Sequence, residues 1–161
     1  MKLLVLGNSS ILNRKVLPAL NKFKNLKIEL ASKRKIKRDI AYVKTYNSYE
    51  DAIKKTTAKI VYISLINSKH YFWAKKCLEY KKHVIVDKPI TVNSRELVSL
   101  VLLAKKKNLF ISESIVFHYH KQFNQLIKKI NLKKLIKIKT YFHIPKLDKT
   151  NFRNNSKLGG G

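Results

Sequence analysis

The segment His83-Val84-Ile85-Val86-Asp87-Lys88-Pro89-Ile90 is the most informative part of the chain. Its apolar run has the composition of a buried strand, and it ends abruptly in a charged Asp-Lys pair followed by proline. A similar run at residues 60–66 leads through Asn67-Ser68-Lys69-His70 into a helical pattern. Because open α/β sheets bind ligands at the carboxyl ends of their strands, we expect both strand ends to border one crevice.

Strand and helix patterns alternate around this segment. We expect strands at residues 2–6, 27–32, 42–46, 60–66, 83–86 and 109–112. Helices are expected at residues 11–24, 49–53, 67–80 and 93–107, with Ser10, Ser48 and Asn67 as candidate helix caps. The alternation predicts an α/β fold with a doubly wound, parallel, Rossmann-like sheet and right-handed crossovers.

The pattern changes beyond about His118. A helix is expected through Phe123, Leu126, Ile127 and Ile130, and residues 135–144 alternate between apolar and polar side chains. Such alternation is typical of an antiparallel strand with one wet face. We therefore expect an α+β domain to start here and to remain incomplete at residue 161.

The charge of the chain allows two interpretations. The net charge is +27 and the pI is about 10.3, which is common in nucleic-acid-binding proteins. Only five of the 36 basic residues are arginine, the side chain best suited to reading bases and phosphates. The charge therefore indicates either a solvated surface set by composition or a functional surface that attracts polyanions.

Other features of the composition narrow the class of protein. The single cysteine, Cys77, excludes an internal disulfide and is expected to be a buried thiol on a helix. The longest apolar run is much shorter than the roughly 20 residues that span a bilayer, and the first residues lack a signal-peptide core. We expect a cytoplasmic protein with no membrane partner.

The order and spacing of these motifs resemble the Gfo/Idh/MocA family of NAD(P)-dependent oxidoreductases. The family's Pro-Asn-x-x-His turn and its later Glu-Lys-Pro correspond to residues 66–70 and 87–89 here. Residues 152–161 resemble the stretch before the family's Gly-Gly-Gly-x-x-x-Asp-x-Gly-x-His segment, and the sequence stops within that motif. The resemblance implies a dinucleotide-binding domain at residues 1–117 and the incomplete start of a substrate and oligomerisation domain at residues 118–161.

The resemblance also implies an activity: hydride transfer to or from a hydroxyl or keto carbon of a sugar or sugar nucleotide. The expected partner is a small carbohydrate substrate, and the full-length enzyme is expected to be a homo-oligomer. This chain is expected to bind nucleotide and to be catalytically incomplete. The alternative is a basic, non-enzymatic Rossmann-like module that binds nucleic acid or another polyanion.

NADP is the cofactor that the residues favour over NAD. The first turn offers Gly7, with Ser9 at the place of the fingerprint's second glycine, ahead of a helix whose free N–H groups suit a pyrophosphate. The second strand ends Ala31-Ser-Lys-Arg-Lys35 and lacks the carboxylate typical of NAD-specific proteins. The expected cofactor-binding residues are Gly7, Asn8, Ser9, Ser10, Ser32, Lys33, Arg34, Leu65, Asn67, His70, Asp87 and Lys88.

Lys88 is the candidate catalytic residue. The cofactor supplies the hydride chemistry, so the protein must add orientation and a proton donor or acceptor, which a lysine desolvated in the crevice provides. Asp87 is expected to orient its ammonium, and the family often has the following Lys-Pro bond cis. The resemblance assigns a weak substrate contact to Tyr119 and His120. No metal site is expected, because the pair formed by His118 and His120 lacks a third ligand.

Overall fold

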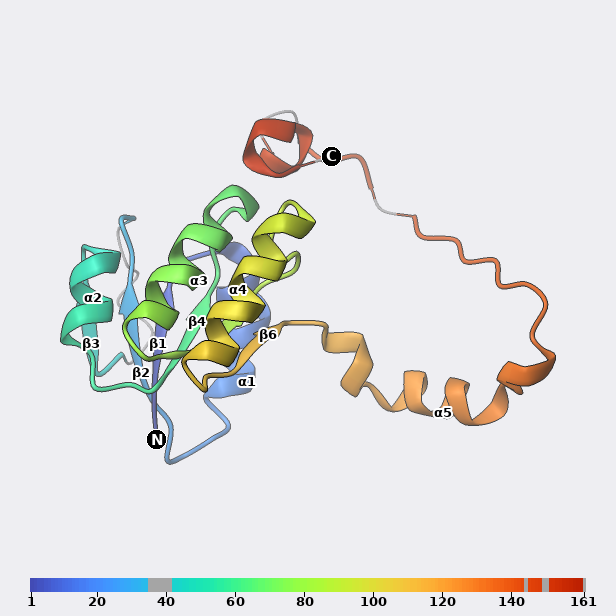
Figure 1. Ribbon diagram of the computed structural model, residues 1–161, viewed down its shortest axis with the longest axis horizontal. Coiled ribbons are helices and arrows are strands. Elements are labelled where there is room, and N and C mark those ends of the chain that lie inside the picture. The colour runs from blue at the N-terminus through green and yellow to red at the C-terminus, as the bar shows by residue number, and fades with distance from the viewer. Residues whose placement is uncertain (35–41, 144, 149–150, 161) are drawn as a thin grey trace.

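The computed structural model describes residues 1–34, 42–143, 145–148 and 151–160. Six parallel strands form one sheet in the order β3-β2-β1-β4-β5-β6 (Figure 1). Their bounds are Lys2–Leu6 for β1, Lys27–Ala31 for β2, Lys44–Tyr46 for β3, Ile60–Ile63 for β4, His83–Val86 for β5 and Ile111–Glu113 for β6. The order reverses beside β1, which pairs with both β2 and β4. The predicted doubly wound α/β sheet is confirmed, and its switch point lies where the chain turns out of β1.

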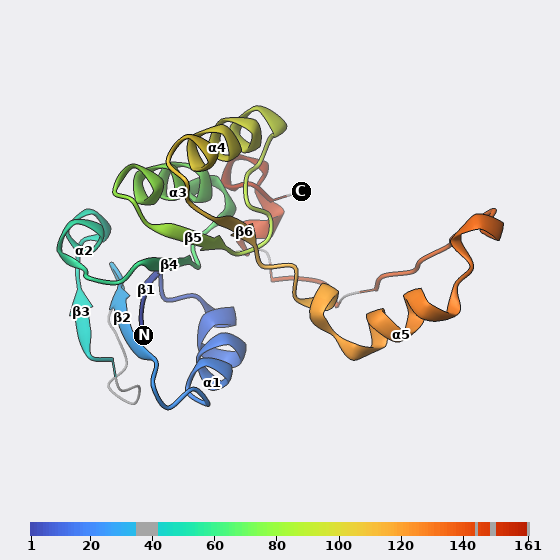
Figure 2. The ribbon, with the colours of Figure 1, turned by 60° about the horizontal axis from the view of Figure 1, so that its bottom comes forward.

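Helices cover both faces of this sheet (Figure 2). The helices α2 (Tyr49–Lys55), α3 (His70–Glu79) and α4 (Ser94–Lys106) lie on one face. A π-helical turn (Leu12–Val16) and α1 (Leu17–Leu20) lie on the other. Buried apolar residues separate accordingly into two clusters: one contains Leu4 and Leu6 of β1, and the other contains Leu3 and Val5. The near-continuous apolar character of β1 therefore follows from its burial on both faces.

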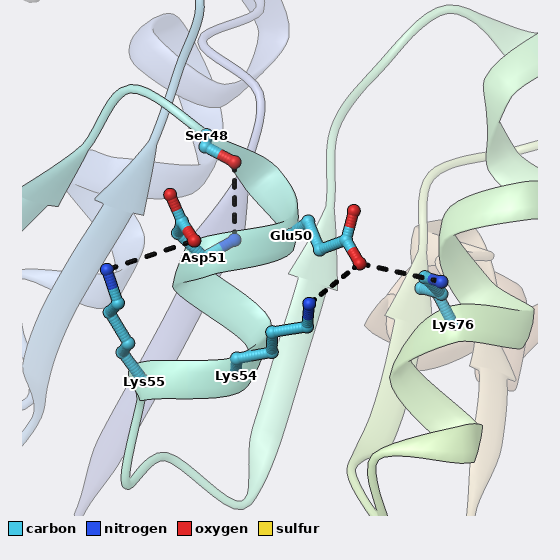
Figure 3. A network of polar contacts seen from close by, with 6 residues as sticks. All are labelled: Ser48, Glu50, Asp51, Lys54, Lys55 and Lys76. Atoms are coloured by element: carbon cyan, nitrogen blue, oxygen red, sulfur yellow. Dashed lines mark hydrogen bonds and ion pairs between the residues drawn. The ribbon is translucent and has the colours of Figure 1, made fainter.

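Local signals explain where α2 begins. Ser48 caps the helix as predicted, with its Oγ accepting a hydrogen bond from the Asp51 N–H at 3.2 Å. Glu50 in the first turn pairs with Lys54 at 3.0 Å and with Lys76 of α3 at 3.7 Å (Figure 3). These ion pairs are exposed, so their contribution to stability is small. The helix owes its position mainly to burial of its apolar side.

Two further predictions are confirmed on the face of the sheet that carries α2, α3 and α4: the start of α4 and the burial of Cys77. Asn93 caps α4 by accepting from the Glu96 N–H at 2.9 Å, and the helix starts within one residue of its predicted position. Cys77 lies buried on α3, and burial raises the pKa of its thiol. The thiol is therefore a packing group with little thiolate character.

The chain leaves the sheet after β6. It passes through a 3-10 turn (Val116–Tyr119) and α5 (Lys121–Lys129) and continues as an extended arm (Figure 1). We call residues 116–148 the C-terminal arm. The chain then returns to the carboxyl edge of the sheet as two 3-10 turns, Phe152–Asn154 and Ser156–Leu158.

The strand predicted at residues 135–144 is wrong for residues 135–143, and residue 144 lies outside the described residues. Alternating side chains make a strand only when a neighbouring strand pairs with its backbone. No described segment pairs with residues 135–143. Apolar side chains such as Ile136 (99% exposed) and Phe142 (88%) consequently face solvent. In the described parts of the chain, no helix has both the length and the apolar content needed to cross a membrane.

Candidate functional site

The site begins at the turn after β1, where only glycine fits. Gly7 has φ +99°, and a Cβ on it would overlap the carbonyl oxygen of Ser64 and lie 2.6 Å from Cδ2 of Leu65. Its N–H donates to the carbonyl oxygen of Ala31 at 2.9 Å. Gly7 therefore lets the ends of β1, β2 and β4 meet at one place on the carboxyl edge.

The next residues start the first helix. Ser9 is its cap, because its Oγ accepts from the Leu12 N–H at 3.0 Å and shares a hydrogen bond with Ser64 Oγ at 2.7 Å. The helix already includes Ser10, so the expectation that Ser10 caps it is wrong by one residue. The Ser9 hydroxyl is thus taken up by the protein, and what this turn offers a ligand is its backbone.

Asn8 is also held by its own helix. Its Oδ1 accepts from Nδ2 of Asn13 at 2.7 Å, an interaction that the sequence analysis did not anticipate. The first N–H groups of any helix lack intrahelical partners and carry the positive end of the dipole. The small-residue turn at residues 7–10 accordingly presents donors suited to a phosphate group.

The end of β2 carries cations and a buried hydroxyl. Ser32 is buried, and its Oγ both donates to the carbonyl oxygen of Arg34 and accepts from the Arg34 N–H, each at 3.0 Å. Lys33 and Arg34 are exposed, and the Lys33 ammonium lies 6.0 Å from the ring centroid of Tyr49. Ser32 therefore shapes the turn, while the two cations are free to meet an anion. Lys35, the last residue of the predicted basic run, lies outside the described residues.

Asp87, at the end of β5, is tied to the sheet. Its Oδ1 accepts from the Tyr62 hydroxyl, and its Oδ2 accepts from Ser64 Oγ at 2.7 Å. Burial, and then the hydrogen bond to Asp87, raise the pKa of Tyr62. The expected ion pair between Asp87 and Lys88 is not formed, because both carboxylate oxygens are engaged by hydroxyls. Tyr62 and Ser64 were missed; the available signal was two polar side chains two residues apart in an apolar strand.

Lys88 stands at the turn after β5. The Lys88–Pro89 peptide bond is cis, and the following Ile90 N–H donates to Oε1 of Glu113 at 2.9 Å. Glu113 ends β6 and was not predicted to have a role; its position directly after an apolar strand was the available signal. The Lys88 side chain is exposed in this structure, so the desolvation expected for it is not observed.

His70 lies beneath the same turn. It is completely buried, with Nδ1 2.7 Å from the carbonyl oxygen of Pro89 and Nε2 3.1 Å from that of Leu65. Both ring nitrogens are therefore engaged within the protein, which corrects the expectation of a direct cofactor contact by His70. Leu65 is half-buried beside Gly7, and its contact with a dinucleotide stays a prediction.

Asn67 does not cap the helix after β4. Lys69 holds the cap position of α3, and Asn67 lies within a 3-10 turn (Asn67–Lys69) whose own cap position is Ile66. Its Nδ2 donates instead to the carbonyl oxygen of Gly159 at 2.8 Å. Asn67 thereby joins the carboxyl edge of the sheet to the last turns of the chain, which no pattern in the sequence indicated.

Tyr119 and His120 are not brought to Lys88. Both lie at the start of the C-terminal arm, which Figures 1 and 2 show extending away from the sheet. Tyr119 is 80% exposed, and Nδ1 of His120 accepts from the Gln122 N–H at 3.2 Å, capping α5. His120 lines an apolar cavity of about 550 Å³ on the arm. The described residues contain no group of three metal-ligating side chains.

Three features thus lie along the carboxyl edge of the sheet, on both sides of the switch point. They are the Gly7 turn, the cationic end of β2 and the Lys88 turn. A family model described as an oxidoreductase family with an NAD-binding Rossmann fold matches residues 1–114. The chain belongs to the Gfo/Idh/MocA family. Membership confirms the resemblance read from residues 66–70 and 87–89.

This chain is similar to several oxidoreductases, and two of them are named for sugar substrates. It is 28% identical over 165 residues to a dTDP-3,4-didehydro-2,6-dideoxy-α-D-glucose 3-reductase of Saccharopolyspora spinosa, covering 98% of this chain and 50% of the relative. It is 34% identical over 76 residues to a D-xylose 1-dehydrogenase (NADP(+)) of Hypocrea jecorina, covering 47% of this chain and 19% of the relative. The chain spans about half the length of the full-coverage relatives it matches.

A solved structure shares the fold. The structure of KijD10, a 3-ketoreductase of Actinomadura kijaniata, in complex with NADP and TDP-benzene, matches with a TM-score of 0.88 at 24% identity. The match covers 100% of this chain and 52% of KijD10. At this identity the likeness establishes the architecture alone, and it extends through the C-terminal arm.

Proposed function

We propose that this chain is the NADP-binding part of an oxidoreductase that transfers hydride to or from a hydroxyl or keto carbon of a sugar or sugar nucleotide. The single observation that carries this proposal is that the Gly7 turn, at the switch point, and the Lys88 turn lie on the same carboxyl edge of a parallel sheet. The relatives named as a dTDP-sugar 3-reductase and a D-xylose 1-dehydrogenase support the substrate class.

The described residues fit a dinucleotide. The N–H groups at the start of the first helix would hold the pyrophosphate, since the first N–H groups of a helix have no partners within the helix. Lys33 and Arg34 would hold a 2′-phosphate at the end of β2, where a carboxylate selecting NAD is lacking. The nicotinamide supplies the hydride chemistry when it is bound. Lys88 would hold or deliver the proton at the substrate oxygen.

The test of cofactor choice is a fluorescence titration with NADPH and NADH. The double variant Lys33→Ala/Arg34→Ala should lose at least about tenfold in NADPH affinity, because a charge-assisted phosphate contact contributes about 1.5–3 kcal/mol. Its affinity for NADH should change little. The matched control is Lys24→Ala/Lys27→Ala, which removes the same charge around the opposite end of β2. Equal wild-type affinity for both nucleotides would contradict the assignment of NADP.

The net charge of +27 favours one other function, a non-enzymatic module that binds nucleic acid or another polyanion. Binding of this kind depends steeply on salt because each neutralised phosphate releases counterions. We expect DNA retained at 50 mM salt to be released at 200 mM, and NADPH binding to persist. The same salt-sensitive retention on DNA together with no response to NADPH would support the module instead.

A further inference from the structure

We propose that His70 is a positioning residue that fixes the Lys88 turn to the loop after β4, so that nucleotide bound against that loop meets Lys88 in a defined place. This inference rests on the proposed function for its purpose, but its geometry concerns this chain alone. His70 starts α3, directly after the turn that follows β4.

The His70 ring contacts one backbone carbonyl group in the loop after β4 and one in the Lys88 turn. Nδ1 lies 2.7 Å from the carbonyl oxygen of Pro89, and Nε2 lies 3.1 Å from that of Leu65. Both partners are acceptors, so each ring nitrogen contributes to the link only when it carries a proton. The Nδ1 contact is the shorter of the two, so we take Pro89 as the principal partner.

Burial makes this link strong. His70 is 0% exposed, and the two carbonyl groups that it contacts belong to half-buried residues. Loss of the donor to such a carbonyl should raise the population of an open turn by about fivefold to 150-fold. Pro89 has no N–H of its own and therefore cannot pair with the sheet as a strand residue would.

A second hydrogen bond holds the Lys88 turn, and its amide can be followed by experiment. The Ile90 N–H donates to Oε1 of Glu113 at 2.9 Å, one residue after Pro89. On the other side, Leu65 packs against Gly7, the residue that begins the nucleotide turn. His70 thus stands between the wall that would hold the dinucleotide and the turn that carries Lys88. Hydrogen exchange of the Ile90 amide reports whether the turn stays in place.

Two conservative variants separate positioning from simple packing. An asparagine amide nitrogen falls near the place of Nδ1, and a glutamine amide nitrogen falls near that of Nε2. His70→Asn should keep the donor to Pro89 and leave Ile90 exchange within about threefold of wild type. His70→Gln should keep only the donor to Leu65 and speed Ile90 exchange about tenfold or more. The measurement is amide hydrogen exchange by NMR on the ¹⁵N-labelled chain, with and without NADPH.

The control is His83→Gln at the opposite end of β5, where Nδ1 accepts from the Phe110 N–H at 3.0 Å. It should leave Ile90 exchange unchanged. In wild type and His70→Asn, saturating NADPH should slow Ile90 exchange further, and in His70→Gln it should not. Equal Ile90 exchange in the two His70 variants would overturn the inference, as would faster exchange in the asparagine variant. If wild type binds no NADPH but the two variants still differ as stated, the positioning contact stands and only the proposed function fails.

Discussion

Replacing Gly7 with alanine tests the geometry of the nucleotide turn most directly. The backbone at φ +99° costs a residue with a Cβ about 1–2 kcal/mol. The new Cβ would also overlap the Ser64 carbonyl oxygen, and Ser64 is fixed because its N–H donates to the carbonyl oxygen of Leu6 at 2.8 Å. Relief of such overpacking costs about 1–3 kcal/mol. We therefore expect Gly7→Ala to lower the free energy of unfolding by about 2–5 kcal/mol.

The assay is urea unfolding followed by the fluorescence of Trp73, the single tryptophan, which packs against the core from α3. With a slope of about 2 kcal/mol/M, the midpoint should fall by at least about 1 M, and NADPH affinity should fall with it. Ser10→Ala is the control, because Ser10 is exposed in the same turn and already has a Cβ. An unchanged midpoint and unchanged NADPH affinity in Gly7→Ala would refute the steric reasoning.

Three further changes have defined outcomes. Ser64→Ala removes the donor to Asp87 Oδ2 and should lower urea stability by about 1–3 kcal/mol; a loss below about 0.5 kcal/mol would show that water replaces the hydroxyl. Burial and then the hydrogen bond to Glu29 raise the pKa of Tyr46 to about 12, so the unfolded chain loses this proton between pH 10 and 12 while the folded chain keeps it. The free energy of unfolding should therefore fall between pH 10 and 12. Urea titrations should show a smaller fall for Tyr46→Phe than for wild type. Lys88→Ala should leave NADPH affinity within about twofold because the contacts proposed for the pyrophosphate and the 2′-phosphate lie elsewhere, and it should abolish turnover in any longer form of the protein that reduces a keto sugar; retained turnover would exclude the proton-transfer role.

Most of the sheet could be predicted because a buried parallel strand has the sequence of a short run of apolar residues. The bounds of β1 (Lys2–Leu6) and β5 (His83–Val86) match their predictions, and the other four strands differ by one to three residues at their ends. Strand ends are set by where partners stop pairing, which the sequence of one strand does not contain. The error at residues 135–143 has the same origin, because alternation predicts a strand and pairing makes one.

The sequence predicted where the site residues lie in the fold better than it predicted which atoms they contact. Gly7, Lys88 and the cations after β2 lie at the carboxyl edge as the strand ends required. Which hydroxyl meets which carboxylate depends on register between strands, so the joining of Asp87 to Tyr62 and Ser64 was not foreseeable. His70 was identified as important, but its burial between two carbonyl groups follows only from the packing of α3 on the sheet.

The central place of β1 has a consequence for how the molecule assembles during synthesis. Of the six described strands, β1 is synthesised first and lies in the middle of the sheet, and Ile60 of β4, which pairs with Leu3, is synthesised almost sixty residues later. Parallel neighbours cannot be joined by a tight hairpin, so every pairing waits for a crossover. Such non-local pairing is slow and leaves apolar strands exposed in the meantime. One edge of β1 can therefore pair with β2 early, while its other edge has no strand partner until residue 63 has emerged.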